Sequence, residues 1–135
     1  MATPSEQSKS PALLNALRIA MVVQLLVGIA LWTGHGYALR NFHMAVGMLF
    51  VLLLWTIAIR AFARRHRVPL AVFALVWGLV IPALGMMQQR LLIGDLHWIV
   101  RLLHLAVGVA AMPMAGLLSA PTPTSHHVSA TRTAA

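Results

Sequence analysis

Residues 40–62 read RNFHMAVGMLFVLLLWTIAIRAF, a run that is apolar almost throughout. A membrane-spanning helix needs about 20 mostly apolar residues, so this run predicts one. Its first eight residues, RNFHMAVG at 40–47, return as RLLHLAVG at 101–108, near the start of another apolar run. Each copy places a histidine, His43 or His104, inside a predicted span. Because ionisable side chains at membrane depth are costly, such residues mark functional sites.

The composition places the whole chain in a membrane. Of its 135 residues, 60% are hydrophobic and 9% are charged, and the mean hydropathy is +0.84. The apolar runs are continuous rather than alternating, which argues against a β-barrel. Their connections are short, so we expect an all-α membrane protein, an up-down-up-down bundle of four transmembrane helices. The expected spans are Leu13–Trp32, Phe42–Phe62, Val68–Met87 and Leu96–Ala120.

The repeated motif predicts a pseudo-twofold arrangement of two-helix units. Each unit has an even number of helices, so the two copies run in the same direction through the membrane. Outside the motif the units share little beyond Gly28 and Gly85. The bundle should cover residues 13–120, and the polar tails at 1–12 and 121–135 are expected to be disordered.

The distribution of basic residues predicts the orientation. Lysine and arginine favour the cytoplasmic side of a membrane, so we expect both tails and the 64–67 loop in the cytoplasm, with the chain in a bacterial inner membrane. The net charge of +8 is interpreted as this signal and as attraction to anionic lipid, rather than as nucleic-acid binding. The basic residues on the predicted cytoplasmic side are Lys9, Arg18, Arg60, Arg64, Arg65, Arg67 and Arg132, and those on the other side are Arg40, Arg90 and Arg101.

The two motif histidines are the expected ligands of one metal-containing cofactor. On parallel helices and at similar depth, His43 and His104 can face each other and supply both axial nitrogens of one haem b near the periplasmic face. The chain has no cysteine, which excludes disulfides, cysteine-ligated clusters and c-type haem. Zinc would need further protein ligands.

The residues around the histidines fit the same hypothesis. Arg40 and Arg101 lie one helical turn nearer the water, where guanidinium groups suit haem propionates. Gly47 and Gly108 lie one turn deeper, where the missing side chain leaves room for a flat macrocycle. Close helix packing by small residues is the alternative explanation of such a pattern.

Further polar residues lie near the same face. His97, two turns before His104, and His35 are candidates for contacting a propionate or a quinol headgroup, or for supplying a second ligand set. The alternative, that they are ordinary interfacial histidines, stays open. Asp95 precedes the last span, where we expect it to cap the helix.

A four-helix unit with one histidine on its second helix and one on its fourth resembles half of a haem A synthase. Proteins of that family are built from two such four-helix halves, and some members have a single half. The resemblance covers about residues 13–118 and rests on His43 and His104. Arg40 stands where the catalytic half has a glutamate, and the outer-loop cysteine pair of many members is absent. The resemblance therefore implies haem binding and this architecture rather than oxidation of a haem methyl group. The chain is also similar, more loosely, to small four-helix cytochromes b that oxidise quinols, without the inner histidine pair of their second haem.

The sequence thus predicts a membrane haem-b protein in electron transfer or haem handling, with a quinol or a periplasmic redox protein as its partner. Two alternatives stay open. The first is a haem-modifying or quinol-oxidising enzyme. The second is a cofactor-free structural or assembly subunit of a membrane complex. A homo-oligomer that rebuilds an eight-helix assembly also stays open.

Overall fold

The computed structural model describes residues 9–34, 36–88 and 90–121. Within them the chain forms four long helices and no strand, and each helix is long and apolar enough to cross a membrane. The prediction of an all-α four-helix bundle is confirmed. The elements in chain order are α2 (Lys9–Trp32), the short 3₁₀ helix η1 (Tyr37–Leu39), α3 (Arg40–Ala63), α4 (Val68–Met87) and α5 (His97–Ser119).

The helix ends differ from the sequence prediction by a few residues. Helix α4 has the predicted bounds, whereas α2 begins at Lys9, four positions before Leu13. Pro11 is tolerated there because the N–H groups of a first turn have no partner within the helix. Of the two predicted tails, residues 1–8 and 122–135 lie outside the described residues.

Asp95 does not cap α5, contrary to the sequence prediction. The residue at the cap position is Leu96, and no side chain there accepts a hydrogen bond from the helix. Instead the N–H of His97 donates to the carbonyl oxygen of Gly94, at 3.0 Å. Gly94 has a φ of +105°, which glycine adopts without strain. The backbone of this turn therefore satisfies the first N–H of α5 without a side chain.

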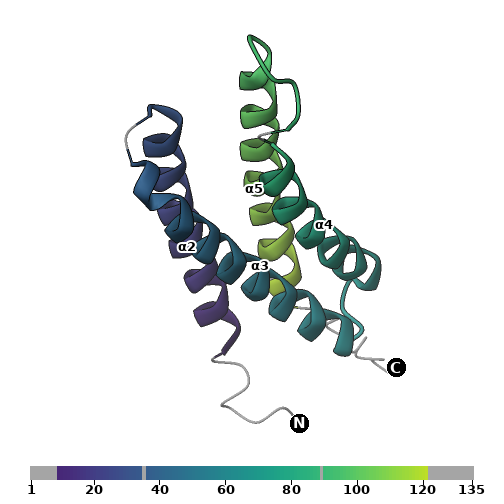
Figure 1. Cartoon of the computed structure of the whole chain (residues 1–135). Helices are drawn as coiled ribbons and strands as arrows, with labels where there is room; N and C mark the ends of the chain where they lie inside the picture. Colours follow the sequence, from purple (N-terminus) through teal and green to yellow (C-terminus); the bar gives the residue numbers. More distant parts are fainter. Residues whose placement is uncertain (1–8, 35, 89, 122–135) are drawn as a thin grey trace, which may run out of the picture.

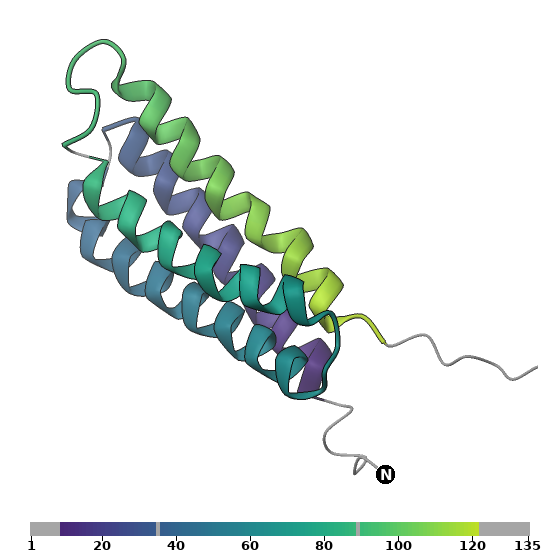
Figure 2. The ribbon, with the colours of Figure 1, turned by 90° about the vertical axis from the view of Figure 1, so that its right-hand side faces the viewer.

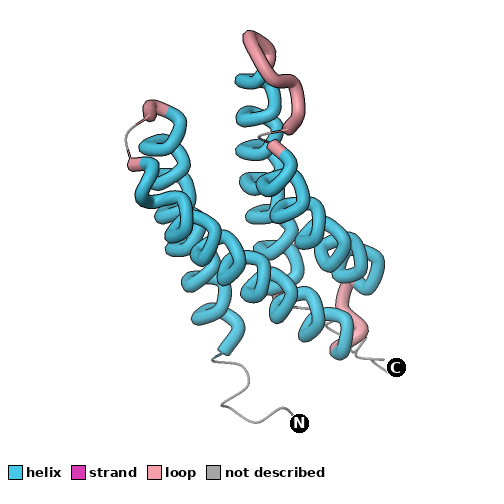
Figure 3. Tube along the Cα trace, in the orientation of Figure 1, coloured by secondary structure: helices cyan, strands magenta, loops and turns pink. Residues whose placement is uncertain are grey.

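The helices form two antiparallel hairpins, α2–α3 and α4–α5. Helices α3 and α5 contact each other across the bundle, whereas α2 and α4 share no contact in the described part of the chain. Figure 1 shows that the hairpins diverge toward the loops that join α2 to α3 and α4 to α5, and Figure 2 shows the same bundle from the side. Figure 3 shows that loops make up only the ends of the bundle. The start of α2, the end of α5 and the 64–67 turn lie together at the other end.

The hydrophobic core lies in the half of the bundle near the 64–67 turn, where the hairpins meet. Alanine is frequent there, which lets helix backbones approach closely. Two tryptophans join neighbouring helices: Trp55 Nε1–H donates to the carbonyl oxygen of Leu75 at 3.0 Å, and Trp77 Nε1–H donates to that of Val107 at 2.9 Å. The core residues with at most 2% of their surface exposed are Leu17, Val51, Leu54, Ala58, Ala61, Ala71, Ala74, Ala111 and Ala115.

The turn between α3 and α4 is tight and carries three arginines. The N–H of Arg65 donates to the carbonyl oxygen of Phe62, and the N–H of His66 donates to that of Ala61, both at 2.9 Å. Arg65 and Arg67 have φ values of +54° and +49°, in the left-handed region that residues other than glycine rarely adopt. The chain thus reverses here through two strained arginines.

Candidate functional site

The two motif histidines face each other near the end where the hairpins diverge. His43 lies at the end of the first turn of α3 and His104 at the start of the third turn of α5, and both are half-buried. Their ring centroids are 6.4 Å apart, and the ring planes are inclined at 55°. The structure therefore brings together the two residues that the sequence motif singles out.

Each histidine packs against a glycine of the preceding helix in its own hairpin. A Cβ atom built on Gly28 of α2 would lie 3.5 Å from Cε1 of His43, and one built on Gly85 of α4 would lie 3.0 Å from Cε1 of His104. The two glycines that the sequence comparison paired thus have the same role in the two hairpins. They let each imidazole lie close to the backbone of the neighbouring helix.

Three polar atoms at this level are buried without a hydrogen-bond partner in the described part of the chain: Nδ1 of His43, Nδ1 of His104 and Oε1 of Gln24. An unsatisfied buried polar atom costs about 1–3 kcal/mol. Native proteins keep few of them, and those that persist need a specific explanation. These three unsatisfied atoms lie close together at the histidine end of the bundle, whereas the core consists of apolar side chains.

Gln24 is a site residue that the sequence analysis missed. A Cβ atom on Gly47 would lie 2.6 Å from Nε2 of Gln24, so the side-chain amide of Gln24 occupies the space beside this glycine. Gly47 lies one helical turn deeper than His43. At Gly108, the equivalent position of the second motif, a Cβ atom would meet nothing within 4 Å. The available signal was that Gln24 is the only strongly polar residue between Arg18 and Trp32.

The spacing of the rings suits one metal ion held between them. Bonds from a metal ion to an imidazole nitrogen are about 2 Å long, and a ring nitrogen lies about 1.1 Å from the ring centroid for bonds near 1.35 Å. Two imidazoles that each point one nitrogen at a metal ion between them would therefore have centroids about 6.2 Å apart. Among the described residues, no group of three or more His, Cys, Asp or Glu could hold a metal ion. Such a pair suits a metal whose remaining ligands come from a cofactor.

The two motif arginines have different surroundings. Arg101 is half-buried, and its guanidinium carbon lies 5.9 Å from the ring centroid of Trp32, at the end of α2. This cation–π contact joins the two hairpins at the histidine end. Arg40, the first residue of α3, is exposed.

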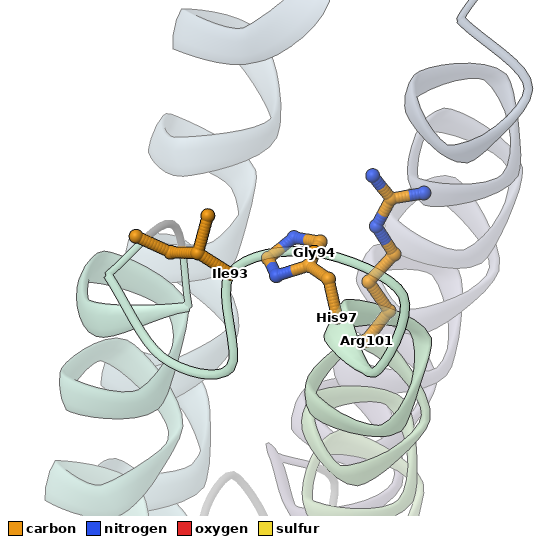
Figure 4. A pocket seen from close by; sticks show the side chains of 4 residues that line it. All are labelled: Ile93, Gly94, His97 and Arg101. Carbon is orange, nitrogen blue, oxygen red and sulfur yellow. The ribbon is translucent and has the colours of Figure 1, made fainter.

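His97 lines a separate pocket at the beginning of α5. Its Nδ1 lies 3.3 Å from the carbonyl oxygen of Leu91. The pocket is open, has a volume of about 330 Å³, and is lined by Ile93, Gly94, His97 and Arg101 (Figure 4). His35, the other candidate histidine, lies outside the described residues.

Comparison of the chain with family models, with curated proteins and with solved structures gives no match. The site is therefore interpreted from its own geometry, which consists of two facing imidazoles, two supporting glycines and one buried amide.

Proposed function

We propose that the chain is a membrane protein that binds one haem b, with His43 and His104 as the two axial ligands, and that it works in electron transfer or haem handling. The observation that carries this proposal is the 6.4 Å separation of the two ring centroids, close to the value for two imidazoles on one metal ion. A haem supplies a one-electron carrier. The absence of a third protein ligand among the described residues supports haem over a bare metal ion.

The surrounding residues fit a flat cofactor between the hairpins. The open space at Gly108 and the lack of contact between α2 and α4 favour a macrocycle that extends from the His43–His104 axis toward these helices. Gln24 lies where its amide can accept or donate a hydrogen bond within the site. A haem held by the imidazoles of His43 and His104 would supply electron exchange rather than oxygen binding.

The charge pattern supports an orientation. Arg60 and the three arginines of the 64–67 turn lie at the end opposite the histidines. By the positive-inside rule this end is cytoplasmic in a bacterial inner membrane, and the haem lies near the periplasmic face. We propose that a quinol or a periplasmic redox protein exchanges electrons there. No second histidine pair lies at the arginine end of the described chain, where His66 is the one histidine.

The test is an absorption spectrum of the detergent-purified protein after incubation with haemin, oxidised and then reduced with dithionite. We expect a sharp Soret band and, on reduction, a narrow α-band. His43→Ala and His104→Ala should each lose this spectrum. His66→Ala, which alters a histidine at the far end of the bundle, should retain it.

Two further variants separate ligation from structural damage. His97→Ala should keep the spectrum, because this side chain lines the neighbouring pocket rather than facing His43. Added imidazole should restore the spectrum of His104→Ala if the lost group is a ligand. A colourless wild-type protein that takes up no haemin would remove the haem proposal and leave the cofactor-free subunit.

A further inference from the structure

The open pocket at the beginning of α5 is lined by two polar side chains and has the volume of a small ligand site. His97 and Arg101 extend from the first two turns of α5, four positions apart and therefore on one side of the helix, and Gly94 and Ile93 of the preceding loop complete the lining (Figure 4). Its volume of about 330 Å³ lies at the lower end of the range for ligand pockets, roughly 300–1,000 Å³.

The Arg101 side chain has donors available for a ligand in the pocket. Within the described chain, the Arg101 guanidinium contacts the face of the Trp32 ring. This contact uses none of the guanidinium N–H groups in a hydrogen bond. A carbonyl can only accept, so Nδ1 of His97 carries the proton in its contact with Leu91. Nε2 of His97 then has no hydrogen-bond partner within the described chain.

The local field also favours an anion. The pocket lies at the N-terminus of α5, where the helix dipole attracts negative charge. Asp95, the single acidic residue among the described ones, is exposed and does not line the pocket. The Arg101 guanidinium and a helix N-terminus therefore act on the same space.

The rim of the pocket is apolar and exposed, which indicates the surroundings of its ligand. Ile93 is 82% exposed, and the neighbouring Leu92, Leu96 and Trp98 are about half exposed, at 50%, 54% and 52%. Tryptophan and apolar side chains at a helix end lie at the boundary between lipid and water. An anionic headgroup that carries acyl chains fits this combination of a basic pocket and an apolar rim.

We propose that this pocket binds the phosphate of an anionic phospholipid headgroup, in the leaflet at the histidine end of the bundle. The Arg101 guanidinium donates two parallel hydrogen bonds to the phosphate oxygens, and the His97 imidazole forms another wall of the same pocket. The acyl chains lie against the exposed side chains of Ile93 and Leu96. This proposal does not depend on haem binding.

The test is native mass spectrometry of the whole protein in detergent, with equal amounts of phosphatidylglycerol and phosphatidylcholine. We expect one phosphatidylglycerol retained in preference to phosphatidylcholine. Arg101→Gln should weaken its retention about tenfold, as loss of charge-assisted hydrogen bonds implies. Arg90→Gln is the matched control, because Arg90 is exposed in the same loop but does not line the pocket.

Circular dichroism and the haem spectrum of each variant are recorded on the same samples, so that misfolding, loss of haem and loss of lipid are separate results. Equal weakening by Arg90→Gln and Arg101→Gln would overturn the proposal in favour of diffuse attraction to charge. Displacement of the lipid by millimolar inorganic phosphate would also overturn it, because the pocket would then bind the free anion. Equal retention of phosphatidylcholine would exclude the anionic headgroup.

Discussion

The two hairpins match at the histidines and differ one helical turn deeper. In each hairpin a glycine of the first helix supports the imidazole of the second. At the next turn, however, the amide of Gln24 fills the space beside Gly47 in α2–α3, whereas the space beside Gly108 in α4–α5 is open. The repeated motif therefore sets where the imidazoles lie, and the residues outside it decide what surrounds them.

This difference makes the two imidazoles inequivalent. His43 has an amide one turn below it, and His104 has open space there. A flat ligand at the two rings would lie near an amide in one hairpin and near an open glycine position in the other. The comparison thus predicts that equivalent substitutions in the two hairpins have unequal effects.

The largest expected effect comes from filling the open space. Gly108→Leu should leave the apo protein folded, because a Cβ atom there meets nothing within 4 Å. If the macrocycle uses this space, retention of haem should fall about a hundredfold, equivalent to about 2.7 kcal/mol. The measurement is haem content from the Soret absorbance at increasing haemin concentration.

Gly116→Leu is the control for that experiment. Gly116 is also open within 4 Å but lies two turns further along α5, away from the histidines. It should bind haem as the wild type does. Equal haem retention by the Gly108 and Gly116 variants would show that the space beside Gly108 is not part of the site.

A smaller difference is expected at the supporting glycines. Gly85→Ala places a methyl group 3.0 Å from His104, which is tighter than ordinary contact, whereas Gly28→Ala places one 3.5 Å from His43. Overpacking costs typically about 1–3 kcal/mol, so Gly85→Ala should lower the free energy of unfolding by about 1 kcal/mol or more. Gly28→Ala should be neutral or slightly stabilising, since alanine favours a helix. Unfolding in sodium dodecyl sulfate, followed by circular dichroism, measures the free energy of unfolding of both variants. An equal loss of stability in the two variants would contradict the proposed difference between the His43 and His104 surroundings.

Removing the buried amide should stabilise the apo protein. Gln24→Met keeps the length of the side chain but removes a carbonyl oxygen that is buried without a partner, so the free energy of unfolding should rise by about 1 kcal/mol. Thr56→Val is the control, because the Thr56 hydroxyl already donates to the carbonyl oxygen of Leu52 at 2.8 Å. If Gln24 hydrogen-bonds within the haem site, the same variant should shift the reduction potential of the bound haem. A destabilised apo protein with an unchanged potential would show that the amide has a packing role.

The smallest effect is expected at the side-chain contact of Arg101 with Trp32, which joins the hairpins at the histidine end. Trp32→Leu removes the ring beneath Arg101 and should cost about 0.5–1 kcal/mol, the usual size of an exposed cation–π contact. Trp98→Leu removes a tryptophan at the same end that has no such contact within the described chain, and should change stability less. Thermal melting of the two variants side by side checks the order.

The fold was predictable from the sequence because apolar length and continuity alone specify membrane helices. The bounds of α4 were predicted as found, and His43 and His104 were correctly expected to face each other. The Asp95 cap was predicted wrongly, because backbone turns satisfy the first N–H groups of α5 as well as a carboxylate does. Helix ends depend on such local competition rather than on hydropathy.

The role of Gln24 was not predictable from a motif on other helices. Its place beside Gly47 depends on the register between α2 and α3, which no local pattern specifies. The contact of Arg101 with Trp32 likewise depends on how the two hairpins meet. Where haem, redox partner and membrane orientation are concerned, the sequence predictions stay predictions.

The strained turn between α3 and α4 has a consequence for how the chain enters a membrane. Replacing Arg65 and Arg67 by glycine would relieve about 1–2 kcal/mol of backbone strain at each position. Yet moving each arginine through the bilayer centre costs about 2.5–3.5 kcal/mol on insertion scales, which exceeds that relief. The arginines therefore oppose inversion of the α3–α4 segment during biogenesis, and a glycine turn would form more easily but would weaken that opposition.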